Sequence, residues 1–260
     1  MTFLSSISAG YSLSGFAVGF LVGLTGVGGG SLMTPILVLL FGIHPATAVG
    51  TDLLFASVTK SVGSMVHGFN ATVDWRITRR LALGSVPATA ATLIALHYLG
   101  SSGGSSLIST VLGFALLLTA VTLVFRKSIV TLAQRHFAEP DPRRTHVLTI
   151  TTGAFLGIVV SLSSIGAGAI GVTALILLYP RLPTARIVGS DIAHAVPLTL
   201  VAGLGHWLLG SVDWLLLNAL LLGSVPGIIV GSIVSARVPD TVLRPILAAT
   251  LVVVGSKLAL

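Results

Sequence analysis

Ten apolar segments follow one another along the chain, and only three charged residues lie well inside them. The segments cover residues 10–26, 31–42, 46–70, 80–99, 106–125, 147–163, 168–180, 185–209, 215–236 and 243–259. A helix needs about 20 apolar residues to cross a bilayer, and several segments reach that length. Helices satisfy their own backbone groups in lipid, as the membrane interior requires. The sequence therefore predicts an all-α polytopic membrane protein.

The composition argues against several other classes of protein. Only 8% of the residues are charged, whereas a soluble domain carries about 25%. The net charge of +7 comes mainly from short Arg clusters between apolar segments, which is typical of cytoplasmic loops and not of nucleic-acid binding. The chain has no cysteine, which excludes disulfides, thiolate metal sites and Cys nucleophiles. No Lys or Arg precedes the first apolar segment, so we expect no cleaved signal peptide.

Glycine clusters interrupt the apolar sequence at two corresponding places. The first holds Gly28, Gly29 and Gly30, and the second, SSIGAGAIG, holds Gly168. Glycine inside a helix costs about 1 kcal/mol relative to alanine, so each cluster predicts a break. Short paired segments of this kind are typical of broken helices in transporters. The hairpins 10–42 and 147–180 can be re-entrant or can cross the membrane twice.

An offset of 139 residues relates the two halves of the chain. It maps Gly50-Thr51-Asp52 onto Gly189-Ser190-Asp191, His67 onto His206, Asp74-Trp75 onto Asp213-Trp214, and Gly84-Ser85-Val86-Pro87 onto Gly223-Ser224-Val225-Pro226. We interpret this as one duplicated unit. The predicted first repeat covers residues 1–126 and the second covers 147–260. A polar, exposed linker at 127–146 joins them.

The basic loops change places between the two copies. The first copy has RITRR after Trp75, where the second has the uncharged LLLN; the second has RVPDTVLR where the first has SSGGSSL. Positive loops stay in the cytoplasm, so equivalent loops face opposite sides of the membrane. The sequence predicts two inverted repeats, each a glycine-broken hairpin plus three transmembrane helices. The linker is then cytoplasmic, and both termini are periplasmic.

The charged residues within apolar segments are Asp52, Lys60 and Asp191. A charge at a helix centre costs about 2.5–3.5 kcal/mol on insertion scales and needs a reason. Helical spacing places Asp52, Lys60 and His67 on one stripe, and Asp191, His194 and His206 close to the equivalent stripe. The aspartates then accept a coupled proton, bind a cation or frame a site, and the neighbouring Lys60 and histidines can take part in the same roles. Alternatively, each carboxylate ties its helix to a broken hairpin, and the histidines are satisfied interfacial residues.

The glycine breaks also suggest a site for a small anion. A half-helix that begins near Gly30 presents free N–H groups and the positive end of its dipole. Two inverted hairpins aim two such ends at the membrane centre, where hydroxyl groups can add donors. The predicted substrate-binding residues are Gly28, Gly29, Gly30, Ser31, Thr51, Ser163, Ser164, Gly168 and Ser190. Close packing of helices through small residues is the alternative interpretation.

With these motifs in place, the chain resembles the TauE/SafE family of bacterial sulfite exporters along nearly its whole length. The resemblance rests on GVGGGSLMTPIL, HPATAVGTDLL, SSIGAGAIG and RIVGSDIAH. The family's motif residues fall on Gly26, Gly28, Gly29, Gly30, Pro35, Gly50, Thr51 and Asp52, and again on Gly168, Gly189, Ser190 and Asp191. The second copy departs from this pattern at Ala167, Ala169 and Ala174. The resemblance implies an inner-membrane permease for sulfite or a small organosulfonate such as sulfoacetate.

The function predicted from these features is secondary transport of a small sulfur-containing anion by alternating access. The implied partners are the anion and the lipid bilayer of the bacterial inner membrane, with no nucleic acid. We expect no enzyme activity, catalytic residue, cofactor or metal. An anion channel, or a transporter for another small anion, remains the alternative. The exact substrate, coupling ion, direction and oligomeric state (monomer or homodimer) stay open.

Overall fold

The computed structural model describes residues 2–25, 30–69, 73–136 and 141–234. Every regular element within these ranges is a helix. The elements are α1 (Thr2–Thr25), α2 (Gly30–Leu39), α3 (Pro45–Phe69), α4 (Trp75–His136), α5 (Pro142–Ser163), α6 (Ala169–Leu178), α7 (Thr184–Leu208) and α8 (Trp214–Val234).

Five helical stretches in the described residues are long and apolar enough to cross a membrane. They are Trp75–Gly100, Gly103–Thr122, Pro142–Ser163, Thr184–Leu208 and Trp214–Gly231. This confirms the prediction of an all-helical polytopic membrane protein. The apolar helix Ala169–Leu178 is too short to span a bilayer of about 30 Å at 1.5 Å per residue.

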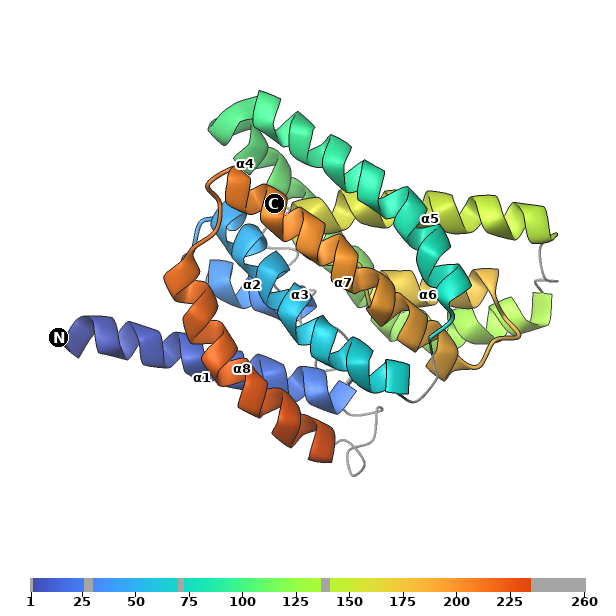
Figure 1. Cartoon of the computed structure of the whole chain (residues 1–260), viewed down its shortest axis with the longest axis horizontal. Helices are drawn as coiled ribbons and strands as arrows, with labels where there is room; N and C mark the ends of the chain where they lie inside the picture. Colours follow the sequence, from blue (N-terminus) through green and yellow to red (C-terminus); the bar gives the residue numbers. More distant parts are fainter. Residues whose placement is uncertain (1, 26–29, 70–72, 137–140, 235–260) are drawn as a thin grey trace.

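The long element α4 consists of two helices that meet at Gly100. This residue has φ 69° and ψ −177°, a conformation that favours glycine because it has no Cβ atom. Figure 1 shows the two parts of α4 running in opposite directions. The sequence suggests an uncharged loop from Gly100 to Ser106, but helix resumes directly after the bend. Helix also continues into the predicted linker, since α4 ends at His136 and α5 begins at Pro142.

Helix boundaries follow the same 139-residue offset as the motifs. Within the described residues, α2 and α6 have equal lengths, as do α3 and α7, and the members of each pair begin and end at equivalent positions. Trp75 begins α4 and the equivalent Trp214 begins α8. The third long helix of the second copy, predicted at 243–259, lies outside the described residues.

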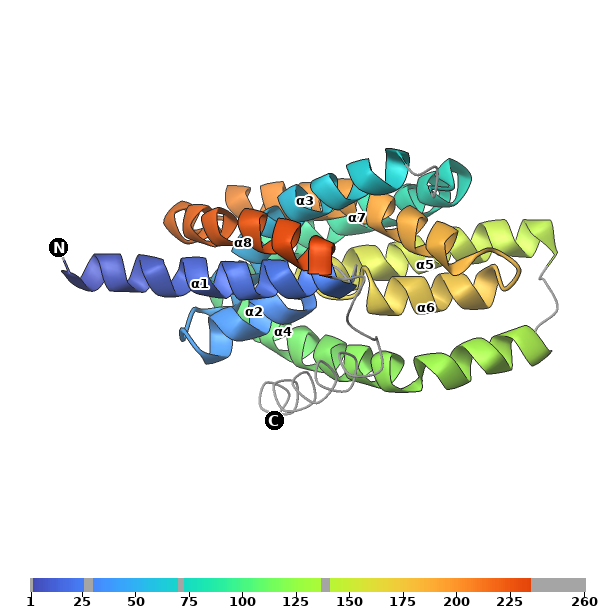
Figure 2. The same cartoon turned by 90° about the horizontal axis from the view of Figure 1, so that it is seen from below.

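Equivalent helices run in opposite directions. In Figure 1, α3 runs towards the end of the molecule at which α7 begins, and the two pack against each other. Figure 2 shows α2 and α6 starting near the middle and running towards opposite ends. In the same view α1 and α2 lie towards one end of the molecule, and α5 and α6 towards the other.

The repeated Gly-Ser-Val-Pro motif permits two close helix contacts. A Cβ atom at Gly84 would lie 1.9 Å from the Ile150 carbonyl oxygen of α5. One at Gly223 would lie 1.8 Å from the Ser12 carbonyl oxygen of α1. Any side chain at either glycine would force the helices apart, as expected for membrane helices packed through small residues.

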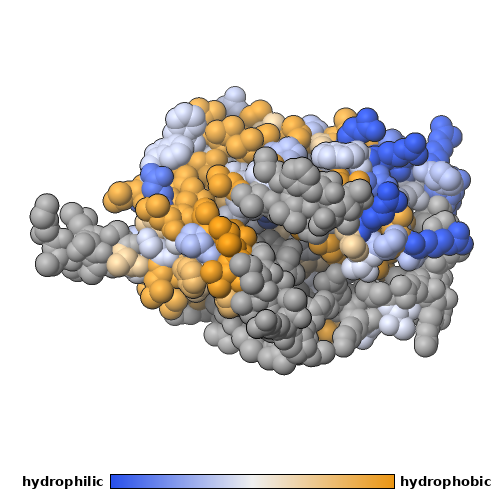
Figure 3. Space-filling view, turned by 60° about the horizontal axis from the view of Figure 1, so that its bottom comes forward, coloured by the Kyte–Doolittle hydropathy of each residue, from blue (hydrophilic) through white to orange (hydrophobic). Residues whose placement is uncertain are grey.

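Basic side chains gather at one end, which we call the arginine end. It consists of Arg76, Arg79, Arg80, Arg143, Arg144, Arg181 and Arg186, from the starts of α4, α5 and α7 and the segment before α7. Figure 3 shows hydrophilic residues concentrated at one end and hydrophobic residues over much of the remaining described surface. The start of α1 and the bend within α4 lie at the opposite end (Figure 1).

Candidate functional site

The first buried carboxylate belongs to Asp52, on α3. It is fully buried and accepts a hydrogen bond from the Thr34 hydroxyl of α2 on one oxygen, Oδ2. Its other oxygen, Oδ1, has no hydrogen-bond partner among the described residues. Ser164 at the end of α5 lies beside this carboxylate, and its buried hydroxyl also lacks a partner there. Asp52 thus joins the first half-helix to the break of the second hairpin.

The side chain of Asp191, on α7, lies beside the N-terminus of the second half-helix, α6. It is 1% exposed, and the backbone N–H of Gly168, the residue before α6, bonds to its carboxylate. A Cβ atom at Gly171 would lie 2.2 Å from Asp191 Oδ1, so only glycine leaves room for this carboxylate. Oδ1 itself has no partner among the described residues. This geometry agrees with the interpretation that the carboxylate ties its helix to a broken hairpin.

Lys60 supplies positive charge near both carboxylates. It lies on α3, is 6% exposed, and is within electrostatic range of Asp52 and Asp191. The equivalent residue on α7 is Thr199, whose hydroxyl bonds to the Ala195 carbonyl of its own helix. The centre of the molecule therefore combines two buried carboxylates with one buried amine, and only the carboxylates follow the repeat.

Thr51 and Ser190 connect the two copies instead of pointing to a shared cavity. The Asp213 N–H donates to Thr51 Oγ1 at 3.1 Å, and the Asp74 N–H donates to Ser190 Oγ at 2.8 Å. Each hydroxyl accepts its bond from the other copy, at the Asp-Trp motif that begins α8 or α4. We call these two bonds the reciprocal clamps. Substrate binding by these two hydroxyls stays a prediction.

The Asp-Trp motif itself caps helices. Asp74 Oδ1 accepts bonds from the N–H groups of Arg76 and Ile77. Asp213 Oδ1 accepts bonds from Leu215 and Leu216 in the same way. Both satisfy donors that a helix N-terminus leaves free.

The histidines of the second copy have structural bonds. His194 is fully buried, and its Nε2 bonds to the Ser85 hydroxyl of α4 at 2.8 Å. His206 is 1% exposed, and its Nε2–H donates to the Ser161 carbonyl of α5 at 2.8 Å. The Nδ1 atom of each lacks a hydrogen-bond partner among the described residues.

The remaining predicted site residues divide between the two breaks. Ser163 Oγ donates to the Val159 carbonyl and accepts the Ile165 N–H. Gly28 and Gly29 lie outside the described residues. Gly30 begins α2, but the side chains of Ser31 and His67 also lie outside the description.

Within the described residues, no group of three or more His, Asp or Glu side chains is arranged to hold a metal ion.

Sequence reasoning missed Thr34 and Gly171, although both contact a central carboxylate. Thr34 could have been found, because the offset maps it onto Thr173. Gly171 closes the SSIGAGAIG cluster, but its equivalent in the first copy is Leu32, so the repeat does not single it out.

Comparison with known proteins identifies the family. The family described as "Sulfite exporter TauE/SafE" matches residues 11–258. The chain belongs to the TauE/SafE family. It is 38% identical over 255 residues to the probable membrane transporter protein YjnA of Bacillus subtilis, covering 97% of this chain and all of the relative. It is 31% identical over 208 residues to a probable membrane transporter protein of Xylella fastidiosa, covering 77% and 74%.

A more distant relative is a probable membrane transporter protein of Methanocaldococcus jannaschii, 26% identical over 211 residues, covering 78% of this chain and 73% of the relative. No solved structure matches the chain significantly. Membership in TauE/SafE and the names of these relatives identify a membrane transporter and confirm the family resemblance seen in the sequence.

Proposed function

We propose that this TauE/SafE protein is a secondary transporter that exports sulfite or a small organosulfonate by alternating access. The observation that carries the proposal is the pair of reciprocal clamps. Two equivalent hydroxyls, Thr51 and Ser190, each bond to the opposite copy through the same Asp-Trp motif. A symmetric contact of this kind suits two halves that rock against each other around a central site.

The proposed topology is inverted, with the arginine end in the cytoplasm of a bacterial inner membrane. The positive-inside rule supports this orientation, since seven arginines gather there. The start of α1 lies at the opposite end (Figure 1), which supports a periplasmic N-terminus. In this account residues 1–126 and 147–260 are the two moving halves, and segment 127–146 is cytoplasmic.

The substrate anion is proposed to bind beside the buried charges, near the N-termini of the half-helices α2 and α6. The family description names sulfite, and a half-helix N-terminus attracts an oxyanion. Asp191 already lies at the N-terminus of α6, so a second negative charge there needs compensation. Lys60 supplies one positive charge near both carboxylates. A proton bound to one of the two aspartates supplies the second positive charge.

Proton coupling follows from the unpartnered carboxylate oxygens. Oδ1 of Asp52 and Oδ1 of Asp191 have no hydrogen-bond partner among the described residues. A protonated carboxyl group donates one hydrogen bond, which a bound oxyanion accepts. Proton and anion binding then favour each other, so the two move together.

Flux into and out of proteoliposomes tests the proposal. Vesicles are loaded separately with sulfite, sulfoacetate, taurine, sulfate or chloride, with and without a pH gradient. We expect saturable flux of a sulfur anion that responds to the gradient, and Asp52→Asn should remove that response. Absence of flux for every sulfur anion would contradict the proposed substrate class, and flux of Asp52→Asn with an unchanged pH profile would contradict the role of Asp52.

A further inference from the structure

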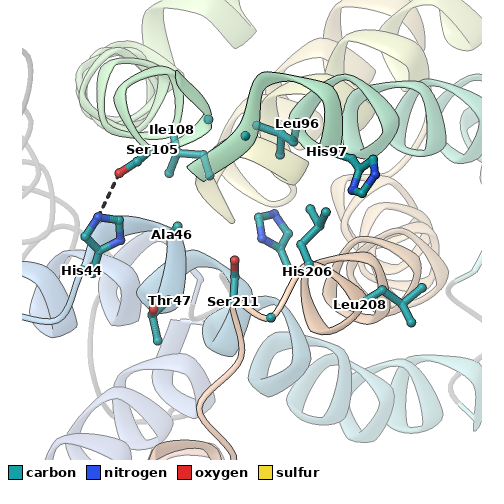
Figure 4. A pocket seen from close by; sticks show the side chains of 14 residues that line it. His44, Ala46, Thr47, Leu96, His97, Ser105, Ile108, His206, Leu208 and Ser211 are labelled. Carbon is teal, nitrogen blue, oxygen red and sulfur yellow. Dashed lines mark hydrogen bonds between the residues drawn. The ribbon is translucent and has the colours of Figure 1, made fainter. Parts of the chain in front are cut away.

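A pocket of about 510 Å³ opens at the end of the molecule opposite the arginine end. We call it the histidine pocket, because His44, His97 and His206 line it together with Ser105 and Ser211. Figure 4 shows His206 between the other two histidines, with Ser211 beneath it. No carboxylate, lysine or arginine is among its described lining residues.

Local structure holds His206 and Ser211 together. The chain turns tightly after α7, where Gly210 has φ 74° and the Ser211 N–H bonds to the His206 carbonyl. On the other side, Gly50 packs against both, since a Cβ atom there would lie 2.4 Å from the Ser211 carbonyl oxygen and 3.0 Å from His206 Cβ. The pocket therefore borders the Gly50-Thr51-Asp52 motif.

The bond from His206 to Ser161 determines what His206 can offer a ligand. Ser161 lies in the last turn of α5, where carbonyl groups lack helical partners. Because Nε2–H donates to that carbonyl, a neutral His206 carries a bare lone pair on Nδ1. Nδ1 is buried and has no hydrogen-bond partner among the described residues. A ligand that reaches Nδ1 from the pocket must displace the side chains that cover it, and it must either bring a proton or bind after Nδ1 has accepted one.

The titratable groups around His206 are also histidines. His44 precedes α3 and shares a 2.9 Å hydrogen bond with the Ser105 hydroxyl of α4, and His97 lies on α4. From α5 the contact is the Ser161 carbonyl, which is neutral. A positive charge on His206 would thus face hydroxyl groups and imidazole rings, with no carboxylate in the described lining to neutralise it.

We propose that the histidine pocket is a second anion-binding site, which holds one small oxyanion together with one proton shared with His206 Nδ1. Serine hydroxyls, at Ser211 and Ser105, supply further donors. The site rests on the proposed function, in which this end faces outwards, and it receives the anion after the central site releases it. The pocket volume exceeds that of a single small oxyanion, so water completes the ligand's hydration.

Binding to the purified full-length protein tests this site. The probes are sulfite and methanesulfonate; the latter carries no titratable proton near neutral pH, so proton uptake by the protein is directly visible. Calorimetry at about pH 6 and about pH 8, in buffers of different ionisation enthalpy, gives the affinity and the protons taken up. We expect about one proton per methanesulfonate and at least about tenfold tighter binding at the lower pH.

Two variants separate the pocket from the centre. His206→Gln keeps an amide near the Nε2 position for Ser161 but lacks Nδ1, and should weaken proton-linked binding at least about tenfold. Gly104→Leu adds a side chain to the pocket lining at a position where a Cβ atom meets only ordinary contacts, at 3.5 Å and 3.7 Å from Leu96, and should have the same effect, with thermal unfolding as the check on folding. The double variant Asp52→Asn, Asp191→Asn should retain proton-linked binding although transport is lost.

Loss of proton-linked binding in the double aspartate variant, with binding intact in His206→Gln and Gly104→Leu, would overturn the second site. The absence of any proton-linked binding to the unaltered protein would also overturn it. Neither result would overturn the proposed function, which is judged by flux: a protein that transports sulfite without this binding has the central site alone.

Discussion

The two copies of the Gly-[Thr/Ser]-Asp motif share a framework and differ in their chemistry. Thr51 and Ser190 form equivalent clamps to the opposite copy. The adjacent aspartates are both buried, but Asp52 accepts a bond from the Thr34 side chain, whereas Asp191 accepts one from the Gly168 backbone. The bonds that follow the repeat thus connect the two copies, whereas the surroundings of the two carboxylates differ. In the proposed transporter, we expect the shared bonds to belong to the moving framework and the residues that break the symmetry to recognise the anion.

The largest chemical difference between the copies is at Lys60, because its equivalent in the second copy is Thr199. Lys60→Thr makes the two copies alike and removes the cation near two buried carboxylates. We expect sulfite flux to fall at least about a hundredfold, since an uncompensated buried charge is costly. The matched control is Thr199→Val, which removes a bond within one helix. Similar flux for both variants would show that Lys60 has no special role.

Gly171 is the second central residue that differs between the copies, because its equivalent in the first copy is Leu32. Gly171→Val places a side chain where a Cβ atom would lie 2.2 Å from Asp191 Oδ1. We expect this crowding to destabilise the protein by about 2 kcal/mol and to abolish transport. Thermal unfolding in detergent and flux measure the two effects. As a control, Gly103→Ala meets only ordinary contacts at 3.6 Å and should behave as the unaltered protein does.

Thr34 and Thr173 are equivalent residues with different partners. Thr34 donates to the Asp52 carboxylate, whereas Thr173 donates to the Ala169 carbonyl of its own helix. Thr34→Val should cost about 1.5 kcal/mol and lower flux about tenfold, because it removes a bond to a charged group. Thr173→Val should change flux little. Equal losses of flux in the two variants would contradict a special role for the bond between Thr34 and Asp52.

Loss of a reciprocal clamp should change flux least. The two clamp variants should shift the protein towards opening at opposite ends of the molecule. Thr51→Val removes the clamp bond from Asp213, worth about 1 kcal/mol, and Ser190→Ala removes the clamp bond from Asp74 together with the bond that Ser190 Oγ donates to the Arg186 carbonyl. We expect Thr51→Val to favour opening at the histidine pocket and Ser190→Ala to favour opening at the arginine end. The chain has no native cysteine, so labelling of a single cysteine in Ser211→Cys reports on opening of the pocket. Identical changes in labelling for both variants would contradict two separate gates.

Much of the fold could be predicted because its signals are local and repeated. Apolar segments gave most of the helices, and the offset of 139 residues matches the observed bounds of α2 and α6 and of α3 and α7. Helix over residues 127–136 and from Pro142 was not predicted, because the sequence there is polar, although polar residues can still extend a helix. The single-residue bend at Gly100 was missed because glycine and serine also favour loops.

The site was harder to predict, because long-range partners decide what each side chain does. Burial of Asp52 and Asp191 follows from their place inside apolar segments, whereas the bonding of Thr51 and Ser190 to the opposite copy needs the three-dimensional structure. Likewise, His206 belongs to a pocket built from three helices and two turns. Spacing within one helix carries no information about such partners.

Counterflow tests the central claim of alternating access most directly. Proteoliposomes are loaded with unlabelled sulfite at high concentration and diluted into a trace of labelled sulfite. A carrier with one alternating site should accumulate label transiently above its equilibrium level, because outward sulfite returns the site to face the label. Uptake without that overshoot, with electrical conductance far above carrier rates, would identify a channel and contradict the account.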